Sequence, residues 1–246
     1  MALIPALTDF TFMEEKKGRL FVNSPNALDG NIASKCDTAA AKFQSEETGL
    51  VDGVGTEADI LAQIRALVGM LPANNEDEAY TECTDNLNRA CPDLANCAGD
   101  TGILLSQISD NGVVFETKKN YAKDMVTAFI RLNGATVGAV ANRSEIYGTD
   151  GTLEETFDGT LSAKGAKKAA AFVKFCDAFG IPVLTITNVK GFKATKCSEK
   201  FMAQNVAELT YAFADATVPK VNVVVGQAYG SAYLAMNSKS IGADMV

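Results

Sequence analysis

The chain has 246 residues, of which 47% are hydrophobic and 21% are charged, as in ordinary globular proteins. Its net charge of −8 argues against a nucleic-acid partner, because phosphate binding needs a basic surface. The chain contains no histidine, which removes the usual general base and the commonest metal ligand from any chemistry it performs.

The first part of the chain is predicted to contain two short strands and one helix. Residues 11–25 are typical of two strands around a Lys-Lys-Gly turn. Thr56 can cap a helix that runs to about Leu71, with apolar residues along one stripe, and Pro72 then ends it. Residues 73–99 are polar, acidic and poor in β-branched side chains, so we expect a boundary or linker here.

The second part of the chain is more regular. Val126–Leu132 and Ala135–Ala141 flank Asn133-Gly134, a strong signal for a two-residue hairpin. The expected elements that follow are a helix at 162–179, a buried strand at 181–187, a loop at 188–199, a helix to 216, a buried strand at 221–225, a helix from about 231 and the start of another strand at 242–246. This alternation predicts a layered α/β core.

Charge is unevenly distributed along the chain. Residues 45–100 hold twelve acidic side chains against two arginines, whereas residues 160–200 hold eight lysines against two acidic side chains. The second stretch could steer an anionic ligand, and both stretches could equally be solvated faces.

The sequence points to a cytoplasmic protein. The opening MALIPALTDF lacks the basic start and long apolar core of a signal peptide, and we find no apolar run of the roughly 18 residues that span a membrane. None of the six cysteines forms a C-x-x-C pair, so disulfides are not expected. Cys83, Cys91 and Cys97 lie at spacings too loose for a zinc or iron–sulfur site; no metal is expected, and their role is left open.

Gly230, Ser231 and Ala232 are the most informative residues for chemistry. They follow a predicted buried strand and open a helix, where unpaired backbone N–H groups favour an anionic oxygen. A turn of small residues can equally serve packing alone, and both interpretations stay open at this point. Ser231 lacks both a full G-x-S-x-G motif and a histidine to activate it, so a serine hydrolase is excluded.

A second candidate is the segment Asn188–Phe192, which follows the other predicted buried strand. Ligands bind at the carboxyl ends of strands in open α/β sheets. Gly191 would permit an unusual backbone angle, and Phe192 could cover a ring or simply close the core. The lysines at 190, 193, 196 and 200 could meet CoA phosphates or line a solvated loop.

Several runs of the sequence resemble one known family. These runs are PALTDF, LPANNE, YAKDMVTAFIRLNGATVGAVANR, AKKAAAFVKFCDAFGIPVLTITNVKGF and LTYAFADATVPKVNVVVGQAYGSAYLAMNSKSIGAD. They are similar to the carboxyltransferase subunits of biotin-dependent acyl-CoA carboxylases, such as acetyl- and propionyl-CoA carboxylase, and of the related glutaconyl- and methylmalonyl-CoA decarboxylases. The runs are dense after Tyr121 and thinner before it.

The resemblance implies a partial crotonase-like fold, an α/β spiral of ββα units. It divides the chain into residues 1–75, the end of the acyl-CoA domain; residues 76–100, an acidic linker; and residues 101–246, the front of the biotin domain. The chain would then be about half a subunit, without the acyl-CoA oxyanion loop, and by itself largely inactive. The implied partners are a biotin carrier domain, acyl-CoA, further copies in a hexamer and, in decarboxylases, a membrane subunit that would bring the protein to the membrane.

The resemblance also implies roles for single residues. The backbone N–H groups of Ser231 and Ala232, after Gly230, would bind the ureido oxygen of carboxybiotin, and no side-chain base would be needed. Leu234 would line the acyl pocket. The residues expected around the cofactor are Asn188, Val189, Gly191, Phe192, Tyr229 and Tyr233.

The chain departs from the family pattern at several of these positions. The family commonly has a second glycine at Ser231, an acidic residue at Leu234 in propionyl-CoA enzymes, and Asp-Val-Pro-Gly-Phe at Asn188–Phe192. The expected function is carboxyl transfer between carboxybiotin and an acyl-CoA, in either direction. Two alternatives stay open: a crotonase-type acyl-CoA hydratase or isomerase, and a non-catalytic fragment that only binds a partner.

Overall fold

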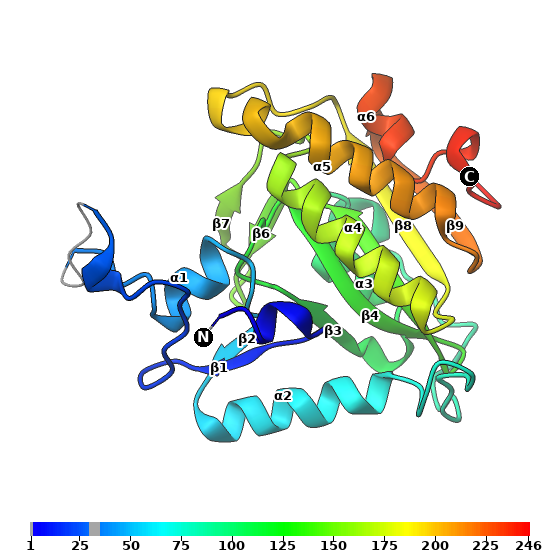
Figure 1. Cartoon of the computed structure of the whole chain (residues 1–246). Helices are drawn as coiled ribbons and strands as arrows, with labels where there is room; N and C mark the ends of the chain where they lie inside the picture. Colours follow the sequence, from blue (N-terminus) through cyan, green and yellow to red (C-terminus); the bar gives the residue numbers. More distant parts are fainter. Residues whose placement is uncertain (1, 30–34) are drawn as a thin grey trace. The chain divides into compact units, whose positions relative to one another are not determined.

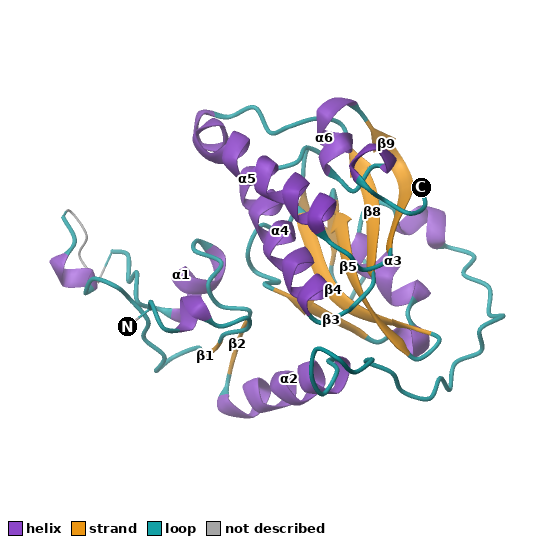
Figure 2. Cartoon of the chain, turned by 45° about the vertical axis from the view of Figure 1, so that its right-hand side comes forward, coloured by secondary structure: helices purple, strands orange, loops and turns teal. Residues whose placement is uncertain are grey.

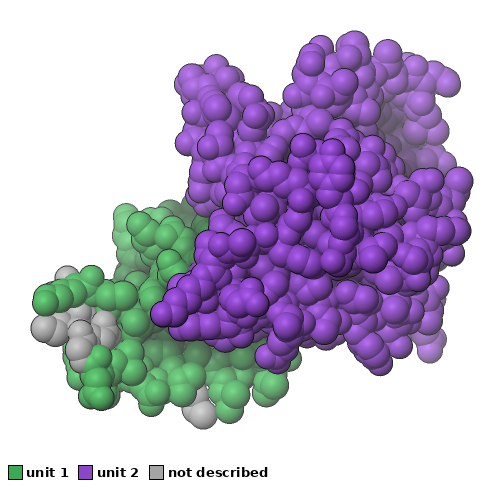
Figure 3. Space-filling view, turned by 90° about the horizontal axis from the view of Figure 1, so that it is seen from above, with its two compact units in different colours: residues 1–69, 117–122 green, residues 70–116, 123–246 purple. Residues whose placement is uncertain are grey.

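The computed structural model describes residues 2–29 and 35–246. The chain forms two compact units, coloured separately in Figure 3. Unit 1 comprises residues 1–69 and 117–122, and unit 2 comprises residues 70–116 and 123–246. No helix within the described ranges is long and apolar enough to cross a membrane.

Unit 1 is built around two short parallel strands, β1 (Phe12–Glu14) and β2 (Gly53–Gly55). In the chain, the short helix α1 (Ala41–Glu46) comes between these two strands. Of the two strands predicted within residues 11–25, only the first forms in the described structure, and the prediction of the second was wrong. The chain does turn after Glu14, whose carboxylate accepts backbone N–H bonds, but Arg19 then makes only an isolated bridge to Ala40.

The helix α2 (Glu57–Met70) matches the helix predicted from residue 56 to about 71. Thr56 begins it as predicted. Its hydroxyl accepts the N–H of Asp59 at 3.3 Å, and the Asp59 carboxylate accepts the N–H of Thr56 at 3.1 Å. These reciprocal bonds satisfy donors that a helix N-terminus otherwise leaves unpaired.

Unit 2 is built on one five-stranded sheet with the strand order β3-β4-β5-β8-β9 (Figure 1). Strands β4 and β5 are antiparallel, whereas β5, β8 and β9 run parallel. The elements are α3 (Thr101–Ile108), β3 (Val114–Thr117), β4 (Met125–Leu132), β5 (Ala135–Asn142), β6 (Glu145–Tyr147), β7 (Leu153–Thr156), α4 (Ala163–Ala178), β8 (Val183–Val189), α5 (Lys196–Asp215), β9 (Lys220–Ala228) and α6 (Gly230–Ala235).

Helices cover both faces of this sheet, and α5 lies against α4, as Figure 2 shows. Alternate side chains of β4 explain the layers, because successive residues of a strand point to opposite faces. Val126 and Ile130 pack with Leu105 of α3. Phe129 points the other way and meets Phe172 of α4, with ring centroids 4.9 Å apart. The layered α/β core expected from the sequence is confirmed.

The hairpin predicted at Asn133-Gly134 forms between β4 and β5. Asn133 has φ 51° and Gly134 has φ 80°, the left-handed pair that a two-residue turn requires. The loop predicted at 188–199 is shorter than expected. Strand β8 continues to Val189, and α5 already begins at Lys196, where the Thr195 hydroxyl accepts the N–H of Ser198.

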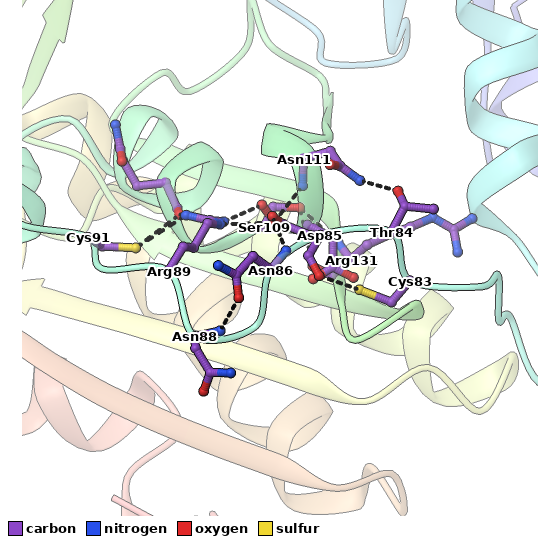
Figure 4. A network of polar contacts seen from close by, with 12 residues as sticks. Cys83, Thr84, Asp85, Asn86, Asn88, Arg89, Cys91, Ser109, Asn111 and Arg131 are labelled. Carbon is purple, nitrogen blue, oxygen red and sulfur yellow. Dashed lines mark hydrogen bonds and ion pairs between the residues drawn. The ribbon is translucent and has the colours of Figure 1, made fainter.

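The segment expected to be a linker is packed within unit 2. The N–H of Thr81 donates to the carbonyl of Gly134 at 2.9 Å. Figure 4 shows the polar network that follows. The Arg89 guanidinium donates to the Asp85 carboxylate at 2.9 Å and to the Ser109 carbonyl at 2.8 Å. The segment predicted to be a linker thus forms hydrogen bonds within unit 2. The domain boundaries that the family resemblance implies stay a prediction.

Candidate functional site

The candidate site lies where β8 and β9 end and α6 begins (Figures 1 and 2). The pairing of the two strands shifts register between Thr187 and Val189, and at their ends Val189 lies opposite Ala228. The N–H of Tyr229 then donates to the carbonyl of Val189 at 3.1 Å. This bond brings together the two segments that the sequence singled out, the chain after residue 187 and the turn at Gly230.

The turn itself offers backbone donors to a ligand. Gly230 has φ 60°, and a Cβ placed on it would meet no atom within 4 Å, so the approach is open. The backbone N–H of Tyr233 donates to the carbonyl of Tyr229 at 3.3 Å. The N–H groups of Ser231 and Ala232 precede this bond and belong to the first turn, which lacks acceptors within the helix. Ser231 is exposed, whereas Ala232 is only 1% exposed, and the role of their N–H groups as donors to a ligand oxygen stays a prediction.

Buried polar side chains hold α6 against the sheet. Asn222 donates to the carbonyl of Met236 at 3.0 Å and accepts from the hydroxyl of Thr187 at 2.7 Å. Asn237, with φ 53°, donates to the hydroxyl of Thr185 at 3.1 Å. Because these groups are almost fully buried, their hydrogen bonds are costly to lose, and the end of α6 is fixed in place.

A chain of amides crosses the carboxyl ends of three strands. Asn142 of β5 accepts the N–H of Asn188 at 3.2 Å, and the side-chain oxygen of Asn188 accepts the N–H of Gln227 in β9 at 2.9 Å. A Cβ on Gly226 would lie only 2.5 Å from that same oxygen. Asn188 is therefore held in a single position beside the turn.

The chain after β8 is held by the segment before α4. Leu161 and Phe192 form a parallel bridge, and the N–H of Leu161 donates to the carbonyl of Gly191 at 2.8 Å. The N–H of Lys193 donates back to Leu161 at 3.0 Å. Gly191 has φ 153°. Half-buried Phe192 thus belongs to a two-segment wall.

An open cavity of about 320 Å³ lies beside this wall. It is lined by Ser144, Phe157, Asp158, Gly159, Asn188, Lys190, Gly226 and Gln227. Of the predicted site residues, only Asn188 lines it. Lys190 was considered only as one of four lysines that could meet CoA phosphates or line a solvated loop. The other six lining residues were missed because they come from three segments that only the folded sheet brings together. A weak signal existed, since Gln227 directly precedes the AYGSA run and Lys190 lies in the predicted loop.

Other predicted residues lie elsewhere. The side chain of Val189 is fully buried in the core, so only its backbone faces the site. Tyr229 is 60% exposed and Leu234 is 46% exposed, and neither lines the cavity. Tyr233 is half-buried on α6. Their roles toward a cofactor or acyl chain stay predictions.

The charged groups of the cavity are a carboxylate and nearby lysines. The Thr160 hydroxyl donates to Asp158, and this bond lowers the pKa of the Asp158 carboxyl, an effect to which the charges of Lys193 and Lys190 add. Within the ranges that the structure describes, no group of three His, Cys, Asp or Glu side chains could hold a metal ion.

Comparison with known proteins identifies the family of this arrangement. The carboxyl transferase domain model matches residues 1–246. The chain is 32% identical to the methylmalonyl-CoA decarboxylase subunit alpha of Veillonella parvula, over 98% of this chain and 48% of that protein. It is 34% identical to the propionyl-CoA carboxylase beta chain of Roseobacter denitrificans, again over 98% of this chain and 48% of the relative.

A solved structure of transcarboxylase 12S, with methylmalonyl-CoA and methylmalonic acid bound, matches with a TM-score of 0.85 at 31% identity. The match covers 98% of this chain and 47% of that one. The predicted crotonase-like carboxyltransferase fold is thereby confirmed. The chain spans about half the length of the relatives it matches. From the match along its whole length, we conclude that the chain belongs to the carboxyl transferase domain family.

Proposed function

We propose that the whole protein transfers a carboxyl group between biotin on a carrier domain and an acyl-CoA. In this proposal the present chain supplies the biotin side of the site. The observation that carries it is the open turn at Gly230, which presents the N–H groups of Ser231 and Ala232 at the carboxyl ends of two parallel strands. The names of the relatives, carboxylases and decarboxylases of acyl-CoA, support the same reaction class.

The turn fits the ureido oxygen of biotin for a physical reason. That oxygen is a hydrogen-bond acceptor, and two adjacent N–H groups at a helix start are fixed donors that need no rearrangement. Biotin itself would carry the carboxyl group and offer a ring nitrogen as the base. The chain's part is to bind and orient the ring, which suits a sequence without histidine. One such donor is commonly worth ~10²–10³ in rate.

The partners of the whole protein follow from the same proposal. They are a biotin carrier domain, an acyl-CoA and further copies of the subunit, because the transcarboxylase 12S structure is described as a hexamer assembly. A membrane decarboxylase subunit would join only if the protein is of the decarboxylase type, and the protein would then be peripheral to a membrane. The 246-residue chain alone is expected to show little turnover, because the resemblance assigns the acyl-CoA loop to another part of the subunit.

Binding of biotinamide, whose ring is that of biotin and whose tail is uncharged, tests the proposal directly. Ser231→Pro removes one N–H, and the first turn of a helix tolerates proline. We expect binding to weaken by about tenfold in a calorimetric titration. The matched control is Ser231→Ala, which keeps the N–H and should bind within about twofold of wild type. Equal binding by both variants, or none by wild type, would refute the role of the turn.

A further inference from the structure

Strands β6 and β7 form a hairpin that is separate from the five-stranded sheet of unit 2. Its tip is closed by the N–H of Gly148, which donates to the carbonyl of Thr152 at 2.8 Å. Along β6, the N–H of Tyr147 donates to the Asp100 carboxylate at 3.0 Å, which fixes the strand to the start of α3. The β6–β7 hairpin is therefore held in place by hydrogen bonds at its tip and along its first strand.

This hairpin presents apolar side chains and carboxylates to solvent. Tyr147 and Leu153 lie opposite each other in the pairing and are 36% and 51% exposed. The pairing shifts register here, so Glu154 is the extra residue of a bulge. The carboxylate oxygens of Glu154 and Asp150 lie 2.5 and 2.9 Å from one point, where a Cβ on Gly148 would be. We call Tyr147, Asp150, Leu153 and Glu154 the acidic surface.

The negative charge of this segment is only partly balanced within the chain. Residues 145–158 hold five acidic side chains and no basic one. Glu155 forms an ion pair with Lys123 at 2.9 Å. Asp150 and Glu154, nearest the tip, are exposed. A partner with positive charge would therefore fit this end of the hairpin.

A surface of opposite charge lies at the start of α5. Lys196 and Lys200 are exposed one helical turn apart, and the neighbouring Phe201 is 58% exposed. One acidic side chain, Glu199, lies between the two lysines in the sequence. Because the N-terminal end of a helix is itself positive, these lysines are better placed when a carboxylate lies near them. We call Lys196, Lys200 and Phe201 the lysine surface.

The two surfaces belong to segments that are bonded to each other. The N–H of Lys190, before α5, donates to the carbonyl of Gly159, after β7, at 3.0 Å. In a two-fold dimer each copy offers the same pair of surfaces to the other, so two complementary surfaces on one subunit are both used. A second copy is the fitting partner because the matching charge lies on this chain itself.

We propose that the acidic surface of one copy docks onto the lysine surface of a second copy, so that a two-fold dimer contains the contact twice. In this dimer Tyr147 and Leu153 pack against Phe201, and the two carboxylates meet the two lysines. The inference rests on the proposed function only where that function includes further copies of the subunit.

The test is sedimentation velocity of the 246-residue chain over a range of concentrations. Wild type should form a dimer that weakens as salt rises from about 0.05 M to about 0.5 M, because exposed charges are screened. Glu154→Lys and Lys200→Glu should each weaken the dimer about tenfold, because like charges then meet at both contacts. The matched control is Glu78→Lys, an exposed position outside both surfaces, which should dimerise as wild type does.

An equimolar mixture of Glu154→Lys and Lys200→Glu gives the sharpest result. Its mixed dimer has one native contact and one in which the reversed charges are again opposite, so it should form within about threefold of the wild-type affinity. The inference is overturned if wild type stays monomeric, if its dimer is insensitive to salt, if either variant dimerises as wild type does, or if the mixture associates no better than its components.

Biotinamide distinguishes this failure from that of the proposed function. Both surfaces lie outside the Gly230 turn, so Glu154→Lys and Lys200→Glu should bind biotinamide as wild type does, whatever their state of association. Equal circular dichroism spectra of the variants and wild type show that the exposed substitutions leave the fold intact.

Discussion

The side-chain oxygen of Asn188 and the backbone N–H of Gln227 are hydrogen-bonded at 2.9 Å across the ends of β8 and β9. The two residues are 39 positions apart in the chain. Their bond fixes the last residues of β9 just before the chain turns at Gly230. The geometry of the proposed biotin turn thus depends on a side chain of the neighbouring strand.

Replacing Asn188 should therefore affect both stability and binding. Asn188→Ala removes the acceptor of the Gln227 N–H, and we expect a loss of about 1 kcal/mol in the free energy of unfolding together with weaker biotinamide binding. Asn188→Asp keeps an acceptor oxygen at the same place and should retain most of both. Urea unfolding and calorimetric titration measure the two effects. If Asn188→Ala binds biotinamide as wild type does, the bond does not position the turn.

The six cysteines should differ widely in reactivity. Cys176 is buried on α4, and burial raises the pKa of its thiol far above the ordinary value. Cys36 and Cys197 are exposed. Because the thiolate is the reactive form, brief iodoacetamide treatment should label the two exposed thiols and leave Cys176 unmodified until urea unfolds the chain. Peptide mass spectrometry gives the extent at each site. Rapid native labelling of Cys176 would contradict the packing of α4 on the sheet.

Local features of the fold were predictable from the sequence because their causes are local. The Asn133-Gly134 turn needs two left-handed residues, and the Ser162 cap of α4 needs one hydroxyl three residues before Gly165. The Gly230 turn was predicted in the same way, because a run of small residues directly follows a predicted buried strand. The second strand predicted before Pro25 does not form, because pairing partners, not composition, decide whether a strand forms.

The cavity could not be predicted in this way. Asn188 meets Asn142 and Gln227 only because β5, β8 and β9 are neighbouring strands and the β8–β9 pairing shifts register between Thr187 and Val189. Likewise, Gly159 lies beside Lys190 only because the segment before α4 is hydrogen-bonded to the chain that follows β8. A single sequence carries no direct signal of register between distant segments. The resemblance to a family supplied the fold but not these contacts.

The contact between Thr81 and the hairpin gives a prediction with a matched pair of glycines. Gly134 and Gly151 have φ of 80° and 78°, so alanine strains the backbone equally at both, by about 1–2 kcal/mol. At Gly134 the added Cβ would also lie 1.9 Å from the Thr81 carbonyl oxygen, whereas at Gly151 it would meet nothing within 4 Å. Gly134→Ala should therefore be more destabilising than Gly151→Ala by a further ~1–3 kcal/mol in urea unfolding.

Equal losses for the two alanine variants would show that Thr81 does not pack over the hairpin in solution. The comparison is also a test of the predicted linker. If the residues around Thr81 were a loose connection, they would move away from the new methyl group at little cost, and only the shared backbone strain would be measured.

The pH dependence of stability should depend on Asp85 in the network of Figure 4. The backbone N–H of Asn111 and then the Arg89 guanidinium donate to its carboxylate, and they hold the pKa of Asp85 below its ordinary value. A pKa lowered in the folded state stabilises the protein above the unfolded value, about 3.9. That contribution is lost as the pH falls through the lower folded pKa.

Asp85→Asn keeps an oxygen for the Asn111 N–H but cannot carry the charge that Arg89 meets. We expect wild type to exceed this variant in urea midpoint at pH 7, and the difference to shrink as the pH falls below about 4. Acid effects of the other carboxyl groups are common to both proteins and cancel in the difference. A difference that stays constant from pH 7 to pH 3 would mean that the ionised Asp85 is not what stabilises this segment. The hydrogen bonds of residue 85, without its charge, would then explain why this segment is ordered.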